Sequence, residues 1–153
     1  ATIPTLTDNL AQFPNDTKII HRAVTGEGVG KVWLNRSVVC PKVDVIGDIE
    51  VQAVSLENCM PDGDDIVLKM DIEFAEFEVL FNAPGSLIRR FSTICMEIHE
   101  LENRTCKAMR DYLNVVGFEM VHRSPMIHWD WGPQGEQLNI REAGAENVKF
   151  KRR

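Results

Sequence analysis

The chain has 153 residues, which suits a single domain, and its apolar content of 44% is enough to build a core. A formal net charge of −6 argues against a nucleic-acid backbone or an anionic membrane as the main partner, because both would repel an acidic protein. No apolar stretch approaches the roughly 18–20 residues of a membrane span. These features favour a single globular domain.

Cysteine spacing and glycosylation sequons bear on the compartment. The four cysteines are widely separated, and no pair has the spacing of a metal site or a redox motif. This favours reduced thiols in a cytoplasmic protein. Three N-x-S/T sequons also fit a secretory history, so the compartment stays open. They begin at Asn15, Asn35 and Asn103.

The first segments of the chain predict a helix end and a strand, followed by a turn. Residues 4–13 have apolar positions at helical spacing, and residues 18–24 are typical of a strand. A glycine-rich stretch, Gly26–Gly30, comes next. A phosphate-binding loop would need a helix after it, and the strand-like run Lys31–Leu34 follows instead. We therefore expect a hairpin turn here.

The chain is organised around the segment that follows. Residues 43–54 predict extended chain with a kink, and Ser55–Asn58 predict one helical turn. The apolar run Ile66–Met70 then comes after a turn cluster and barely alternates, which is typical of a strand covered on both faces in a parallel sheet. Residues 74–82 have aromatic and leucine side chains at helical spacing, and Pro84 ends the pattern.

The second half repeats this strand–helix order. We expect a short helix at Ser86–Arg90, a strand at Phe91–Ile98, a helix from about Glu102 to Val116 and a strand at Phe118–His122. The β-α-β-α-β order from residue 66 predicts an α/β fold with right-handed crossovers.

The last stretch predicts little regular structure. Residues 123–136 are typical of a loop, and Gln137–Arg141 predict an edge strand. From Glu142 the chain is polar, and its basic end Lys149–Arg153 is predicted to be solvated. We therefore expect a single domain over residues 1–141 and a mobile polar tail over residues 142–153.

Polar side chains end two neighbouring strands. Asp71 and Glu73 follow the first strand, and Glu97 and His99 end the second. Parallel strands would bring them to one edge of the sheet, where ligands bind in open α/β folds. An acid there could orient a hydroxyl or bind a divalent metal, and His99 could accept a proton.

Each of these residues also has a purely structural interpretation. Asp71 or Glu73 could simply cap the next helix. Oxygen ligands with one imidazole would suit Mg²⁺, Mn²⁺ or Ca²⁺, but we assign no metal from the sequence. The remaining acids of these segments are predicted to be solvated: Glu76, Glu100 and Glu102.

Residues 65–80 resemble a known signature. They read D-I-V-L-K-M-D-I-E-F-A-E-F-E-V-L, which is similar to D-x-L-L-K-x-D-[VI]-E-G-A-E-x-x-V-L of FkbM-type methyltransferases. The run Met96–His99 is similar to that family's E-[IV]-H element, and His21–Val24 to its A-V strand. The resemblance covers roughly residues 6–122.

The resemblance implies a class I fold with a Rossmann-like sheet of seven strands. It also implies S-adenosylmethionine as cofactor and O-methyl transfer to a hydroxyl of a small molecule or a glycan. By matching position, Asp71 and Glu73 would lie at the cleft for substrate and cofactor, with Glu97 and His99 beside them as catalytic residues. Ala23 and Val24 would lie near the adenine, and Asp71 would also touch the cofactor.

Two departures from the family stand out. Phe74 replaces the signature's glycine, and it would fill space that glycine leaves for a ligand. No glycine-rich loop stands before Ile3, so the chain looks like the C-terminal two-thirds of such a domain, truncated at its N-terminus. Missing strands would expose sheet edges and could make the chain a homo-oligomer. The alternative function is therefore a non-catalytic remnant or oligomerisation module on the same scaffold.

Overall fold

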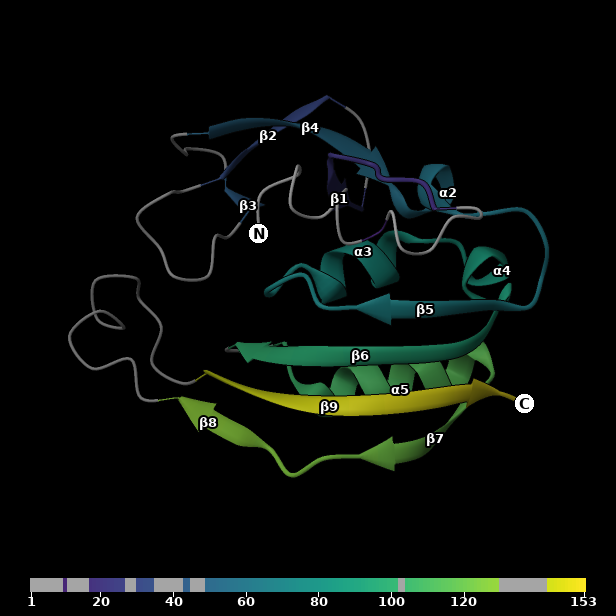
Figure 1. Ribbon diagram of the computed structural model, residues 1–153. Coiled ribbons are helices and arrows are strands. Elements are labelled where there is room, and N and C mark those ends of the chain that lie inside the picture. Colours follow the sequence, from purple (N-terminus) through teal and green to yellow (C-terminus); the bar gives the residue numbers. More distant parts are fainter. Residues whose placement is uncertain are drawn as a thin grey trace.

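The computed structural model describes Leu10 and residues 17–26, 30–34, 43–44, 49–101, 104–129 and 143–153. Within these residues the chain forms a mixed α/β fold with two sheets (Figure 1). The α/β class predicted from the sequence is therefore confirmed. The predicted helix at 4–13 and the predicted strand at 137–141 fall outside the described residues, apart from Leu10.

The first sheet has four strands in the order β1-β4-β2-β3. They are β1 (Ala23–Thr25), β2 (Lys31–Leu34), β3 (Val43–Asp44) and β4 (Ile49–Ser55). Strand β4 pairs parallel with β1 and antiparallel with β2, so it lies between them. The predicted hairpin around Gly26–Gly30 is therefore wrong, because β1 and β2 are not neighbours. The predicted strand at 18–24 is shorter than expected and starts at Ala23.

The order and type of the next elements agree with the sequence predictions. Ser55 caps α2 (Leu56–Cys59) through its hydroxyl. The apolar run forms β5 (Ile66–Met70), which leads to α3 (Glu76–Asn82) and α4 (Gly85–Ile88). Among the described strands, β5 is at the edge of its sheet and its Val67 is 64% exposed, so the predicted cover on both faces is wrong. The second apolar run forms β6 (Phe91–Leu101), which pairs parallel with β5.

Helix α5 (Cys106–Val116) follows β6 and is capped at both ends. Thr105 Oγ1 accepts from the Ala108 N–H, and Glu100 Oε2 accepts from the Cys106 N–H at 2.8 Å. The prediction that Glu100 is solvated is therefore wrong, and Glu102 is outside the described residues. Gly117 ends the helix with φ of 115°, a left-handed conformation that suits glycine, and β7 (Phe118–Arg123) begins next.

The C-terminal segment is a central strand, which corrects the prediction of a tail. Strand β9 (Ala143–Arg152) lies between β6 and β7 and pairs antiparallel with both. A short strand within the predicted loop, β8 (Ile127–Trp129), also pairs with β9. The prediction of a mobile polar tail from Glu142 is therefore wrong. Lys151, Arg152 and Arg153 are exposed, which agrees with the predicted solvation of the basic end.

Strand β9 is ordered because alternate residues face the core. Glu146, Val148 and Phe150 share the buried face, whereas Lys149 and Lys151 alternate with them and are less buried. The buried carboxylate of Glu146 is compensated by ion pairs with Arg110 of α5 and Arg123 of β7. The sequence analysis missed this strand because the composition of the segment is polar.

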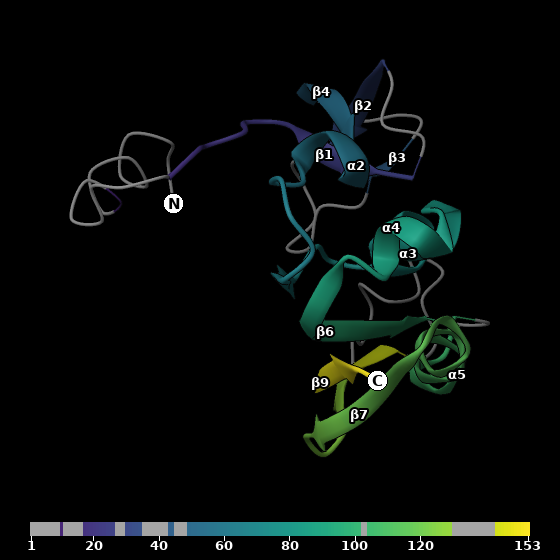
Figure 2. The same ribbon diagram turned by 90° about the vertical axis from the view of Figure 1, so that its right-hand side faces the viewer.

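The core lies between the five-stranded sheet and the helices. The sheet order is β5-β6-β9-β7, with β8 alongside β9. Helix α5 runs along β6 and β9, and α3 lies between β5 and the four-stranded sheet (Figures 1 and 2). Fully buried residues of the core include Leu80, Ile94, Ile98, Leu113 and Phe118. Among the described helices, none is long and apolar enough to cross a membrane.

Candidate functional site

The parallel pairing of β5 with β6 brings the predicted site residues to one place. Met70 at the end of β5 is in register with Met96, in the second half of β6. Asp71 and Glu73 leave the end of β5 there, and His99 lies three positions beyond Met96 on β6. The predicted meeting of two strands at one edge is therefore confirmed.

The turn after β5 has an unusual backbone. Glu73 and Phe74 both have positive φ values, 50° and 73°. Residues other than glycine rarely adopt this left-handed backbone conformation, because their Cβ atom comes too close to the carbonyl oxygen. The turn directs Glu73 back towards β6, and α3 starts three residues later. The N-cap position of α3 is Ala75, which has no side-chain cap, so neither Asp71 nor Glu73 serves as the helix cap.

A buried histidine–carboxylate pair supports the site. Nδ1 of His99 lies 2.8 Å from Oε1 of Glu76, and the two side chains are 3% and 0% exposed. Because an ionised carboxylate can only accept hydrogen bonds, we assign Nδ1 as the donor of this bond, and Nε2 is directed towards the acids of the turn. The same Glu76 oxygen accepts from the Ile72 N–H at 3.3 Å and so also fixes the turn.

The prediction that Glu76 is solvated is wrong. One local signal was present, because Glu76 and Leu80 are four residues apart and share one face of α3, where Leu80 is fully buried. An acid on the apolar face of a short helix needs a polar partner. His99 is that partner.

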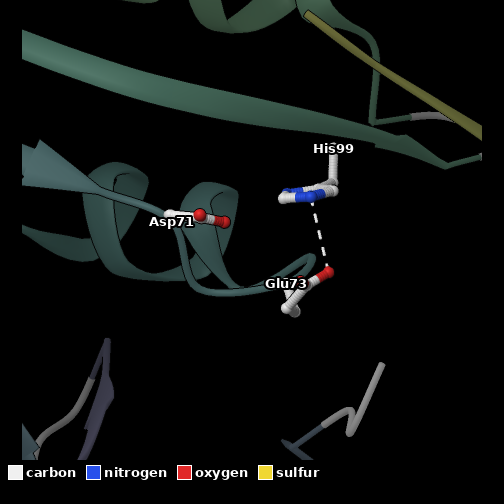
Figure 3. A group of neighbouring side chains, drawn as sticks. All are labelled: Asp71, Glu73 and His99. Atoms are coloured by element: carbon white, nitrogen blue, oxygen red, sulfur yellow. Dashed lines mark ion pairs between the residues drawn. The ribbon is translucent and has the colours of Figure 1, made fainter. Parts of the chain in front are cut away.

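On the side of His99 that faces away from Glu76, the side chains of Asp71 and Glu73 come close to the imidazole. Ligand atoms of Asp71, Glu73 and His99 all lie within 4.8 Å of one another. Figure 3 shows the Glu73 carboxylate directed at the His99 ring, with Nε2 and Oε2 3.4 Å apart. Burial differs across the group, since His99 is enclosed while the side chains of Glu73 and Asp71 are 41% and 48% exposed. The cluster therefore has a buried base, His99, and two acids that are open to solvent, Asp71 and Glu73.

The acids control the charge of His99. Burial lowers the pKa of the imidazole, but the hydrogen bond to Glu76 and the negative charges of Glu76, Glu73 and Glu97 outweigh it, so the pKa is raised above the ordinary 6.5. The site thus attracts positive charge. It could accept a proton, hold the hydroxyl of a substrate or bind a cation.

The other predicted residues are less close. Glu97 is half-buried on β6 two positions before His99, and it acts on the imidazole through its charge. Ala23 and Val24 pair with Ala53 and Val54 of β4, and no described contact joins them to the three-residue cluster. Strand β1 reaches α3 instead, where the Gly26 N–H donates to Glu78 at 3.1 Å.

Phe74 lies against the site. Its side chain is 6% exposed, and its ring centroid is 5.1 Å from that of His99. The backbone carbonyl of Phe74 also accepts from Arg104 at 3.4 Å. The ring therefore occupies space next to the imidazole that a glycine would leave open.

Comparison with known proteins decides the family. Residues 21–120 match the methyltransferase FkbM domain. The chain belongs to the FkbM methyltransferase family. The matched segment runs from the residues before β1 into β7, so it contains every residue of the histidine–carboxylate site in this FkbM-family chain. No curated protein and no solved structure matches the chain.

Proposed function

We propose that this protein transfers a methyl group from S-adenosylmethionine to a hydroxyl of a small molecule or a glycan. The observation that carries the proposal is the polar cluster at the end of β5, within a segment that matches a methyltransferase domain. Ligands bind at the carboxyl ends of parallel strands in α/β folds, and this cluster lies at such an end. We propose that the sheet that carries this cluster belongs to a Rossmann-like methyltransferase fold.

The reaction needs an oriented oxygen and a proton acceptor. A lone pair of the hydroxyl oxygen would form the new bond to the methyl carbon as the carbon–sulfur bond breaks, which leaves S-adenosylhomocysteine. The hydroxyl proton would pass to the exposed carboxylate of Glu73 or Asp71. Alignment of the two reactants would supply most of the rate.

The buried residues would act through this carboxylate. His99 faces Glu73 at 3.4 Å, and Glu76 holds His99 from behind at 2.8 Å. Glu97 adds negative charge near the imidazole. For the cofactor we propose contacts with Asp71 and, at the adenine, with Ala23 and Val24.

Binding and turnover test the proposal separately. Isothermal titration with S-adenosylmethionine and S-adenosylhomocysteine measures cofactor affinity, and transfer of a labelled methyl group to a panel of polyols and glycans measures turnover. We expect Glu73→Gln to lower turnover at least tenfold. Asp111→Asn is the matched control, because Asp111 is an exposed acid on α5 paired with Lys107. No heat of binding at millimolar cofactor would refute catalysis by this chain.

Phe74 favours one alternative, a non-catalytic module that assembles with copies of itself. Its ring fills the position where the family signature has glycine, next to His99. This function predicts a stable oligomer with no affinity for S-adenosylmethionine. Light scattering that shows a monomer, together with cofactor binding, would exclude it.

A further inference from the structure

We infer that Asp71, Glu73 and His99 form a binding site for one divalent cation of the Mg²⁺ or Mn²⁺ class. This inference goes beyond methyl transfer and stands without it, because a cation could bind whether or not the chain is a catalyst. Three independent features of the site carry it: the ligand geometry, the support of the histidine and the balance of charge.

The ligand atoms have the spacing of a metal site. Adjacent ligands of an octahedral ion lie about 3 Å apart when each bond is about 2.1 Å long. Nε2 of His99 and Oε2 of Glu73 are 3.4 Å apart, close to this value. The three-ligand group spans at most 4.8 Å, and the side chain of Asp71 is exposed enough to rotate inward. One nitrogen and two oxygens on one side of the ion would leave other positions open for water or substrate oxygens.

The histidine is held as metal-binding histidines are held. Such a histidine almost always donates its second ring N–H to a carboxylate or carbonyl, which fixes the tautomer and directs the other nitrogen at the ion. Glu76 supplies this carboxylate at 2.8 Å from Nδ1, and it is fully buried. A structural hydrogen bond alone would not require that Nε2 also face two further acids.

The charge of the site is incomplete. Four carboxylates act on or surround His99, those of Asp71, Glu73, Glu76 and Glu97. Among the described residues, their positive partners are His99 and, for Asp71, Lys69 at 3.9 Å. The second oxygen of Glu76 is buried, and no described residue donates to it. The negative charge of the fully buried Glu76 is costly without compensation, and a cation bound beside His99 would add to that compensation.

Direct titration tests the inference. The chain, freed of metal with a chelator, is titrated with MnCl₂ while the electron paramagnetic resonance signal of free Mn²⁺ is recorded. We expect one Mn²⁺ per chain, displaced by excess Mg²⁺. Asp71→Asn and Glu73→Gln should each weaken binding at least tenfold, and Glu76→Gln about 10–100-fold through the loss of support for His99. Asp111→Asn removes the same charge from the exposed surface of α5 and should change nothing.

A second measurement needs no variant. Bound Mn²⁺ should broaden the ring resonances of His99 in a nuclear magnetic resonance spectrum at lower Mn²⁺ concentration, and more strongly, than those of His122 on β7. Absence of binding at millimolar Mn²⁺ would overturn the inference. Equal affinity of the wild type and the double variant Asp71→Asn/Glu73→Gln, or equal broadening of both histidines, would also overturn it. Because cofactor and acceptor are absent from these experiments, their outcome is separate from that of the methyl-transfer assay.

Discussion

The left-handed turn at Phe74 makes a prediction in which two energetic effects oppose each other. Phe74 has φ of 73°, and its side chain is 6% exposed. Removal of a buried phenylalanine ring costs about 3–5 kcal/mol through lost burial and a residual cavity. A glycine at this φ would recover about 1–2 kcal/mol of backbone strain. Packing therefore outweighs strain, and we expect Phe74→Gly to reduce the free energy of unfolding by about 2–3 kcal/mol.

Alanine at the same position separates the two effects. Phe74→Ala also removes the ring but keeps a Cβ in the left-handed region, so it lacks the recovery that glycine allows. We therefore expect Phe74→Ala to be about 1 kcal/mol less stable than Phe74→Gly. This order is the reverse of the usual one in helices and strands, where alanine is the more stable of the two.

Urea denaturation followed by circular dichroism measures both variants on one scale. Ala53 on β4 is a useful reference, because it has an ordinary strand conformation. There Ala53→Gly should be less stable than the wild type, which is the usual order of alanine and glycine. If Phe74→Ala were as stable as Phe74→Gly or more so, the backbone at Phe74 would not be strained. If Phe74→Gly lost less than 1 kcal/mol, the ring would not be part of the core.

Four other predictions concern single side chains. Burial, with Glu146 and Glu100 nearby, raises the pKa of Cys106 to about 12, so its thiol should react with iodoacetamide at pH 8 only when the chain unfolds. Glu146→Ala should cost about 3 kcal/mol in urea denaturation, since it leaves two arginines without their buried partner. Gly117→Ala should cost about 1 kcal/mol, because φ is 115° at the end of α5. The pKa of His99 is raised above 6.5, so its stabilising contribution is complete below pH 6.5 and is lost as pH rises through the folded-state pKa. In metal-free buffer, stability should thus fall more from pH 6 to 8 in the wild type than in His99→Gln.

Local patterns predicted the parallel pair and the helices but missed the strand that completes the sheet. The runs that became β5 and β6 are apolar over consecutive residues, and short apolar runs between turn signals are typical of strands. In β9 the inward positions include Glu146, and a carboxylate there argues against burial. Its partners, Arg110 and Arg123, are 36 and 23 residues away in the sequence, so no local window could reveal the compensation.

The same limit applies to the site. The predicted residues Asp71, Glu73 and His99 come together because the strands are parallel, which followed from the element order. Glu76 was missed because an acid in the first turn of a helix is usually solvated and favourable there. Its burial is a consequence of tertiary packing against His99.

The site combines a residue on a rigid strand, His99, with acids on a strained turn, Asp71 and Glu73. This contrast suits a binding function. His99 stands on β6, which pairs with β5 on one side and with β9 on the other, where His99 is opposite Ala145. Strands inside a sheet hold side chains more precisely than loops do. Glu73 and Asp71 stand on the turn after β5, whose backbone at Glu73 has φ of 50°. Strain of this kind persists only where the surroundings impose it, and here Glu76 imposes it by bonding both the turn at Ile72 and the ring of His99. One buried carboxylate thereby sets the distance between the fixed base and the exposed acids.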